Sequence, residues 1–244
     1  MFFRKRPAKP SEPEIRFLCE PDDEAVIARP FPAQRHLPDW FRKLPAVDSE
    51  HYGLNDTGLT VKRCMPFLDA MSTGWILPLA ASIRLEIANG GTEVVGAWDF
   101  DRAMMSNHGE HQVAGHPWQG KNGPRPPRKF HSFWTIVTPP GYSCLFIAPM
   151  NRPNGIFEIV AGIVDTDTYR APVHFPFFAT ASDGLYALEK GMPLAQVIPF
   201  RRADASLEAY IGPESQEEAA ARVAVSRNTR ASTGWYRTDA RAKR

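Results

Sequence analysis

Short apolar segments separated by turn signals fill the chain between residues 130 and 200. The segments are rich in β-branched and aromatic residues, which favour strands. Pro139-Pro140-Gly141 supplies one of the turns between them. Short strands at this close spacing predict a mainly β fold of the sandwich or barrel type. The expected strands cover residues 133–137, 142–147, 157–160, 162–165, 173–178 and 194–200.

Apolar and polar residues alternate at residues 83–87, which predicts a strand with one buried face. Asn89-Gly90-Gly91 follows, and residues of these types tolerate the positive φ angles of a hairpin turn. Residues 94–98 are again apolar and aromatic. The pattern therefore predicts a β-hairpin over residues 83–98.

Elements outside these strands are fewer and have weaker signals. Residues 15–19 predict a short strand, and Asp39 is the expected cap of one helical turn that ends at Pro45. Residues 101–129 are polar and rich in Gly, Pro and His, which predicts a long loop. Ser215-Gln216-Glu217-Glu218 is a capping box, so a helix is expected to begin there.

Composition changes this picture little. Hydrophobic residues make up 43% of the 244 residues and charged residues 23%, as in an ordinary globular protein. The cysteines are Cys19, Cys64 and Cys144, an odd number at wide spacing, so neither a disulfide framework nor a zinc ribbon is expected. The chain start lacks the apolar run of a signal peptide, and the longest apolar run, 75–81, is too short for a membrane span. We therefore expect a cytoplasmic protein that makes no membrane contact.

The expected domain organisation has three parts. Residues 1–13 are charged and rich in proline, which predicts disorder; 14–212 form a single β-rich domain; and 213–244 form a helix and a basic tail. From Arg222 onward there are seven basic residues against one acid, although the net charge of the chain is only +2. This tail could contact nucleic acid or an acidic partner, or it could be a solvated terminus.

The motifs between residues 135 and 200 resemble those of the dUTPase and dCTP deaminase family, which has a β-clip fold. Pro139-Pro140-Gly141-Tyr142 is similar to the turn that leads into a strand of that family. Later motifs read Gly-Ile-Val-Asp-Thr-Asp-Thr-Tyr-Arg at 162–170, with Thr168 as one extra residue, and Gly-Met-Pro-Leu-Ala-Gln-Val at 191–197. The resemblance implies a β-clip core at 130–200, with N-terminal additions and a C-terminal helix.

The same resemblance implies site residues. Asp165 matches the family's water-activating base, and Tyr169 matches the tyrosine that packs against the sugar. The family's phosphate-binding serine is absent from residues 151–155. Because the family's enzymes are commonly trimers with shared sites, the likeness also implies a homo-oligomer. The whole chain also resembles an uncharacterised family of bacterial and phage proteins, a likeness that adds no function.

Asp165 and Asp167 are the expected catalytic residues. In an extended backbone both side chains would point to the same side. Two close carboxylates can share a proton, bind Mg²⁺ or orient a water molecule as general base; alternatively, both could cap turns. A small anionic ligand such as a nucleotide would then be bound by nearby side chains. The candidates for this binding are Arg152, Tyr142, Tyr169, His174 and Gln196.

A second candidate centre lies in the predicted loop. His108, Glu110, His111 and His116 fall within nine residues, and His108-Gly109-Glu110 has the His-x-acid spacing of a non-haem iron site. His174 or His131 could supply the third ligand. The alternative function is therefore a mononuclear oxygenase that holds Fe²⁺ or another transition metal. A non-enzymatic interaction module that uses the basic tail is the third hypothesis, and the sequence does not decide whether the protein is an enzyme.

Overall fold

The computed structural model describes residues 13–53, 56–116, 125–232 and 234–242. These residues divide into two compact units. Unit 1 comprises the described residues up to Ala33 together with Gly74–Ala205. Unit 2 comprises Gln34–Thr73 and the described residues from Ser206 onward. The sequence placed residues 14–212 in one domain, and those boundaries stay a prediction.

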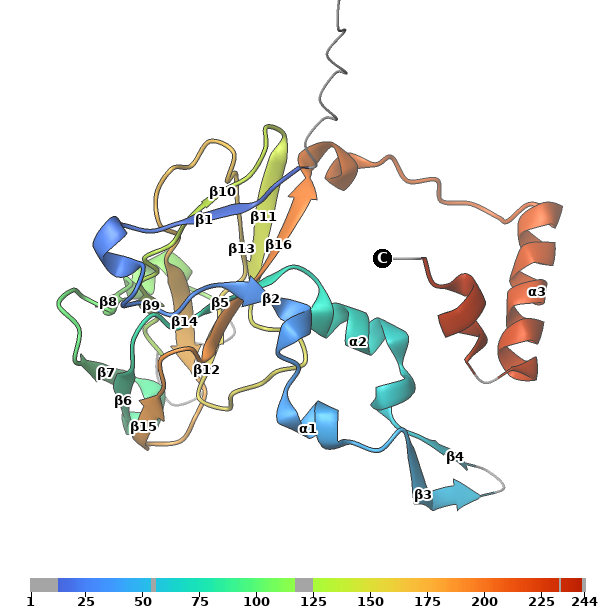
Figure 1. Cartoon of the computed structure of the whole chain (residues 1–244), viewed down its shortest axis with the longest axis horizontal. Helices are drawn as coiled ribbons and strands as arrows, with labels where there is room; N and C mark the ends of the chain where they lie inside the picture. Colours follow the sequence, from blue (N-terminus) through green and yellow to red (C-terminus); the bar gives the residue numbers. More distant parts are fainter. Residues whose placement is uncertain (1–12, 54–55, 117–124, 233, 243–244) are drawn as a thin grey trace, which may run out of the picture. The chain divides into compact units, whose positions relative to one another are not determined.

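Unit 1 is built from antiparallel sheets (Figure 1). A five-stranded sheet has the order β13 (Gly162–Val164), β11 (Tyr142–Ile147), β16 (Pro193–Arg201), β5 (Trp75–Pro78) and β2 (Phe31–Pro32). A four-stranded sheet has the order β12 (Phe157–Ile159), β14 (Phe175–Ala179), β9 (Arg128–Phe130) and β8 (Met105–Asn107). A three-stranded sheet has the order β15 (Gly184–Leu188), β6 (Ile83–Ala88) and β7 (Glu93–Trp98). A separate two-stranded ribbon joins β1 (Arg16–Leu18) to β10 (Thr135–Val137).

Phenylalanine rings form the centre of the core of unit 1. The rings of Phe130 and Phe177 stack with centroids 3.9 Å apart, and the ring of Phe157 lies edge-on to both. Phe130 and Phe177 are completely buried. These three side chains belong to β9, β14 and β12, so their packing holds three strands of the four-stranded sheet together.

The predicted hairpin at 83–98 is confirmed. Ile83, Leu85 and Ile87 are buried while the polar residues between them are exposed, as the alternation predicts. The turn at Asn89–Gly91 has φ angles of 53°, 68° and 88°, and β6 pairs with β7 along its whole length. The sequence pattern and the turn chemistry therefore agree on this element.

The prediction of one long loop at 101–129 is wrong in part. Residues 105–107 form β8 and residues 128–130 form β9, which pair with each other. Strands this short carry too few side chains to show a period of two, and only Phe130 is large and apolar in β9. Their strand conformation is fixed by pairing: β9 lies between β8 and β14.

Unit 2 contains the α-helices. They are α1 (Asp39–Lys43), α2 (Met65–Ser72) and α3 (Gln216–Ala231), accompanied by a π-helical segment at Tyr236–Ala240 and by the hairpin of β3 (Val47–Gly53) and β4 (Asp56–Leu59). The predicted capping box is confirmed: Ser215 Oγ accepts from Glu218 N at 3.2 Å, and Ser215 N donates to Glu218 Oε2 at 2.6 Å. The prediction that Asp39 caps its helix is wrong, because Pro38 occupies that position and the Asp39 carboxylate pairs with Arg42.

The end of the basic tail is held within unit 2. Arg241 donates to both oxygens of Asp69, with Nε–Oδ2 at 2.9 Å and Nη2–Oδ1 at 2.5 Å. The side chain of Asp69 is only 9% exposed. At least this arginine of the tail is therefore not a freely solvated charge, and contact of the tail with nucleic acid stays a prediction.

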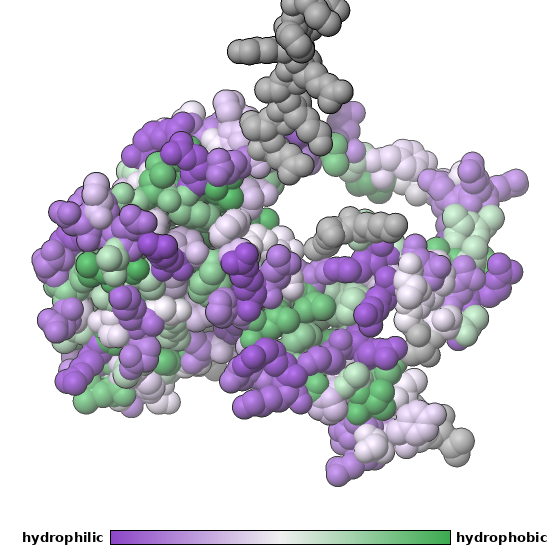
Figure 2. Space-filling view, viewed as in Figure 1, coloured by the Kyte–Doolittle hydropathy of each residue, from purple (hydrophilic) through white to green (hydrophobic). Residues whose placement is uncertain are grey.

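The mainly β fold with a C-terminal helix is confirmed. No described helix combines the length and the apolar character needed to cross a membrane. In the space-filling view, the visible face of unit 1 carries hydrophilic residues with smaller hydrophobic patches between them (Figure 2). Its large apolar residues are mostly in the core, where strands from different sheets contribute them.

Candidate functional site

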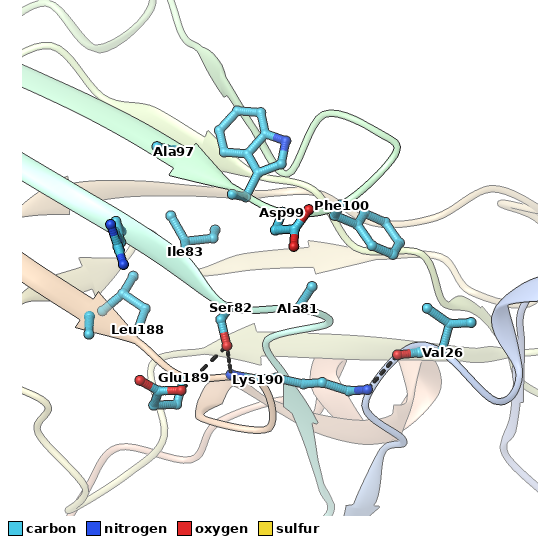
Figure 3. A pocket seen from close by; sticks show the side chains of 13 residues that line it. Val26, Ala81, Ser82, Ile83, Ala97, Asp99, Phe100, Leu188, Glu189 and Lys190 are labelled. Atoms are coloured by element: carbon cyan, nitrogen blue, oxygen red, sulfur yellow. Dashed lines mark hydrogen bonds between the residues drawn. The ribbon is translucent and has the colours of Figure 1, made fainter.

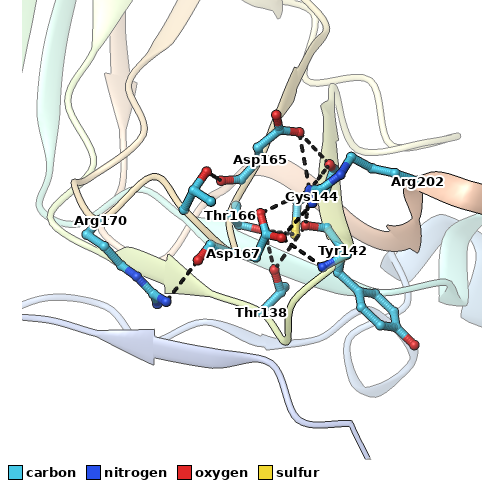
Figure 4. Close-up of polar contacts among 11 residues, drawn as sticks. Thr138, Tyr142, Cys144, Asp165, Thr166, Asp167, Arg170 and Arg202 are labelled. Carbon is cyan, nitrogen blue, oxygen red and sulfur yellow. Dashed lines mark hydrogen bonds and ion pairs between the residues drawn. The ribbon is translucent and has the colours of Figure 1, made fainter.

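The acidic segment lies where β13 ends, as its sequence predicts. β13 stops at Val164, and the amides of Thr168 and Tyr169 donate to the carbonyl of Asp165 at 3.1 and 2.8 Å. Residues 165–169 therefore form a tight turn that presents two carboxylates, Asp165 and Asp167 (Figure 4).

Asp167 is held by three N–H donors. Arg202 donates from Nη1 to Oδ1 at 2.9 Å and from Nη2 to Oδ2 at 2.6 Å, a bidentate ion pair. The amide of Gly141 donates to Oδ2 at 2.8 Å, and the side chain of Asp167 is 7% exposed. The hydrogen bonds from Arg202 and then from Gly141 lower the pKa of Asp167 to about 2.

Asp165 has a different environment although it shares the same arginine. Its Oδ1 accepts from Ser143 Oγ at 2.6 Å and lies 3.5 Å from Arg202 Nη1. Its side chain is 60% exposed. Asp165 can therefore meet a ligand or a water molecule, whereas Asp167 is enclosed.

Sequence reasoning missed Arg202, the residue that joins the two carboxylates. It directly follows β16, and β16 pairs with β11 so that Arg201 faces Tyr142 and Phe200 faces Ser143. No local motif connects residues 167 and 202, and the only sequence signal is the Arg201-Arg202 pair after an apolar run. At Asp167 the guanidinium of Arg202 and the amide of Gly141 take the place of water.

The geometry does not favour a magnesium ion held by both aspartates. Both oxygens of Asp167 already accept N–H donors, and the guanidinium of Arg202 lies within 3.5 Å of both carboxylates. A second cation between them would meet this positive charge. A Mg²⁺ ion that bridges the phosphates of a bound ligand stays a prediction.

A shallow groove lies beside this acidic turn, and we call it the anion groove. It is lined by Pro13, Glu14, Arg16, Val137, Thr138, Pro139, Tyr142 and Arg201. Arg201 Nε donates to the hydroxyl of Tyr142 at 2.9 Å, and its guanidinium lies 5.7 Å from the centre of that ring. Thr138 connects the groove to the turn, since its hydroxyl lies 2.7 Å from that of Thr166.

Two cations of the anion groove are available to a ligand. Across the described residues, the guanidinium of Arg16 has no hydrogen bond or ion pair, and that of Arg201 donates only from Nε, to the hydroxyl of Tyr142. Arg202, by contrast, is neutralised by Asp167. The groove therefore offers two guanidinium groups and an aromatic ring, and the carboxylate of Glu14 also lines it.

Two of the predicted ligand-binding residues lie at the other end of β11. Gln196 faces Ile147, and its Oε1 accepts from Met150 N at 2.9 Å. Arg152 donates from Nη2 to the carbonyl of Ala33 at 2.8 Å, and burial lowers its pKa. Ser143, next to Asp165, is four residues from Ile147, about 13 Å along a strand. The structure thus places Tyr142 and the aspartates near one end of β11, and Gln196 and Arg152 near the other end. Tyr169 is half exposed on the acidic turn.

The histidines form a pair in the described structure. The rings of His131 and His174 stack with centroids 4.5 Å apart. His131 Nε2 lies 2.8 Å from Ser106 Oγ, His174 Nδ1 accepts from Ser132 N at 3.3 Å, and burial lowers the pKa of both rings.

Of the other predicted metal ligands, the structure shows the surroundings of His108 and His116. His108 follows Asn107, which faces Arg128, whereas His131 follows Phe130 at the opposite end of that strand pairing. The ring of His116 stacks on Phe178. In the described part of the chain, no three His, Cys, Asp or Glu residues lie together as metal ligands. The side chain of Glu110 lies outside the described residues, so the iron site of His108, Glu110, His111 and His116 stays a prediction.

A further hollow of about 760 Å³ lies at the end of the three-stranded sheet, with Asp99 and Phe100 on one side (Figure 3). Ser82 Oγ accepts from Lys190 N at 2.9 Å, and Lys190 Nζ donates to the carbonyl of Val26 at 2.5 Å. None of the predicted site residues lines this hollow. Ser82 and Lys190 thus connect the segments around it.

No family model matches the chain, and no curated protein sequence matches it. Among solved structures, native EIAV dUTPase is similar with a TM-score of 0.34 and 12% sequence identity. The match covers 59% of this chain and 87% of the dUTPase chain. At this TM-score the likeness carries no argument about the site, and the interpretation below rests on the residues themselves.

The ion pair of Asp167 predicts a dependence of stability on pH. Because the folded-state pKa is lowered from 3.8 to about 2, the stabilisation is complete above about pH 4 and is lost as the pH falls through 2. We expect the difference in Tm between the wild type and Asp167→Asn to shrink between pH 4 and pH 2. Thermal unfolding of both proteins at pH 5, 4, 3 and 2 measures this difference. A constant difference would show that Asp167 is not ionised through this pair.

Proposed function

We propose that the protein binds a small phosphorylated or otherwise anionic molecule in the anion groove. One observation carries this proposal: Arg16 and Arg201 present guanidinium groups that form no salt bridge among the described residues, and both line the groove with the ring of Tyr142. A guanidinium binds phosphate or carboxylate through paired, charge-assisted hydrogen bonds. The aromatic ring adds a flat surface for a base or sugar.

A nucleotide is the ligand class that agrees with the sequence motifs. We also propose that the strands of residues 130–200 form a β-clip core. Asp165 is the carboxylate suited to activate a water molecule, since it is exposed and is bonded to Ser143, the residue next to Tyr142 of the groove. Asp167 and Arg202 would act as positioning residues that hold the turn. The reaction class would be hydrolysis of a phosphorylated small molecule.

Arg201→Gln tests the ligand site. We expect this change to weaken binding of the ligand about tenfold to a hundredfold, because a hydrogen bond to a charged group contributes about 1.5–3 kcal/mol. Isothermal titration with nucleoside triphosphates and pyrophosphate, with and without Mg²⁺, measures the affinity, and release of pyrophosphate reports turnover. Arg29→Gln is the matched control, because that guanidinium pairs with Glu24 on the surface.

Two outcomes would contradict the proposal. In one, the wild type binds none of these anions and none raises its Tm. In the other, Arg201→Gln and Arg29→Gln bind a ligand equally well, which would place the ligand outside the anion groove.

A further inference from the structure

We propose that the ligand is an elongated amphiphilic anion, with its charged end in the anion groove and an apolar body in the groove next to it. This inference rests on the proposed function and specifies its ligand. The second groove, which we call the ribbon groove, runs along the β1–β10 ribbon. It is lined by Arg16, Leu18, Cys19, Glu20, Pro21, Asp23, Arg102, Phe133, Thr135, Val137, Arg170 and Pro172.

The two grooves are continuous at one pair of residues. Arg16 and Val137 line both grooves, and they face each other across the ribbon. The next pair on the same face, Leu18 and Thr135, lines the ribbon groove alone. Two residues of a strand span about 7 Å, so a ligand anchored at Arg16 reaches Leu18 with a short chain.

The floor of the ribbon groove is apolar. Leu18 is 39% exposed although it is a large hydrophobic residue, and Phe133, Val137 and Pro172 are only partly buried. An apolar body that covers these side chains would remove them from water, which is favourable in proportion to the area covered. The hydrophobic effect therefore favours binding of the apolar part of a ligand in the ribbon groove.

The far end of the ribbon groove offers no free cation to a second anionic group. The guanidinium of Arg102 pairs with Asp23 and lies 3.6 Å from Glu20. It also stacks over Phe133 at 4.5 Å and Phe100 at 5.1 Å, so it is fixed as well as neutralised. Free positive charge is therefore concentrated at the Arg16 end, beside the anion groove.

Arg170 is the remaining cation of the ribbon groove. Its Nη2 donates to the carbonyl of Asp167 at 2.9 Å, which ties it to the acidic turn rather than to the far end. The surface of the two grooves is therefore charged near Arg16, Arg170 and Arg201 and apolar beyond them. A phosphate or carboxylate that carries an alkyl chain or ring system has the matching polarity.

A series of n-alkyl phosphates tests the inference on the full chain. Methyl, butyl and octyl phosphate are titrated by calorimetry below the concentration at which octyl phosphate forms micelles. We expect affinity to rise with chain length by roughly fourfold for each buried methylene until the ribbon groove is filled. Arg16→Gln should weaken binding of all three ligands by a similar factor.

Leu18→Gln should reduce the gain from methyl to octyl phosphate while leaving methyl phosphate binding unchanged. Val137→Thr, which keeps a β-branched side chain on β10, tests the same floor independently. Leu185→Gln on β15 is the matched control, since that leucine is 78% exposed outside both grooves. Vesicles that contain phosphatidic acid form a separate arm, which distinguishes a free amphiphile from a lipid in a bilayer.

The outcomes separate the two proposals. If methyl and octyl phosphate bind equally, the elongated ligand is overturned and the anion groove remains. If no alkyl phosphate and no nucleotide binds, the proposed function itself fails. Chain-length dependence that persists in both floor variants, or binding to vesicles alone, would also overturn the inference.

Discussion

Phe177→Ala is expected to lower the free energy of unfolding by about 3–5 kcal/mol, the usual cost of truncating a buried phenylalanine. Phe177 is completely buried and stacks on Phe130 at 3.9 Å, with Phe157 against the edges of both rings. Alanine would remove these contacts and leave a cavity between three strands that cannot close without shifting β9 or β12. Urea unfolding followed by tryptophan fluorescence measures the loss.

Leu185→Ala is the matched control for this change. Leu185 is a similarly large hydrophobic side chain on a strand, but it is 78% exposed. We expect its truncation to change the free energy of unfolding by less than about 0.5 kcal/mol, as is usual on the surface. Equal losses in the two variants would mean that the phenylalanine cluster is not the centre of the core.

The sequence predicts the elements whose structure depends on residues that lie close together in the chain. The hairpin at 83–98 has both an alternating pattern and a turn sequence, and the helix that begins after Ser215 has a capping box. Both signals lie within a few residues. In contrast, β8 and β9 are three residues long, and their conformation depends on strands elsewhere in the chain. A local pattern cannot contain that information.

The candidate site divides in the same way. The position of Asp165 and Asp167 after a strand follows from local pattern, because apolar Ile163 and Val164 precede two acids. The burial of Asp167 does not follow from local pattern, because its partners Gly141 and Arg202 are 26 and 35 residues away in the sequence. Antiparallel pairing of β11 with β13 and β16 brings all three segments together.

The same pairing explains why the predicted ligand set separates. Gln196 and Arg152 belong to the same series of motifs as the aspartates, but Asp165 contacts Ser143 near one end of β11 while Gln196 faces Ile147 at the other end. A ligand held at the aspartates would have to extend along the strand to reach Gln196. The groove beside Tyr142 is instead completed by Arg16, a residue from the ribbon that the sequence did not single out.

Asp165→Asn and Asp167→Asn are expected to have opposite effects, although only one residue separates the two positions. Asp165 is 60% exposed, so its replacement should change the free energy of unfolding by less than about 1 kcal/mol. It should nevertheless weaken ligand binding or turnover at least about tenfold, and loss of a general base commonly costs about 10²–10⁴-fold in rate. Pyrophosphate release and calorimetric titration measure these quantities, and thermal unfolding measures stability.

Asp167→Asn should lower the Tm far more than Asp165→Asn does. An amide has one acceptor oxygen and no charge, so Arg202 would lose its bidentate partner while the side chain stays enclosed. The protein that remains folded should still bind the ligand, because Asp167 is enclosed by Arg202 and Gly141 and has no free oxygen to offer a ligand. If instead Asp165→Asn unfolds the protein and its folded fraction keeps full activity, Asp165 is a structural cap and the site lies elsewhere.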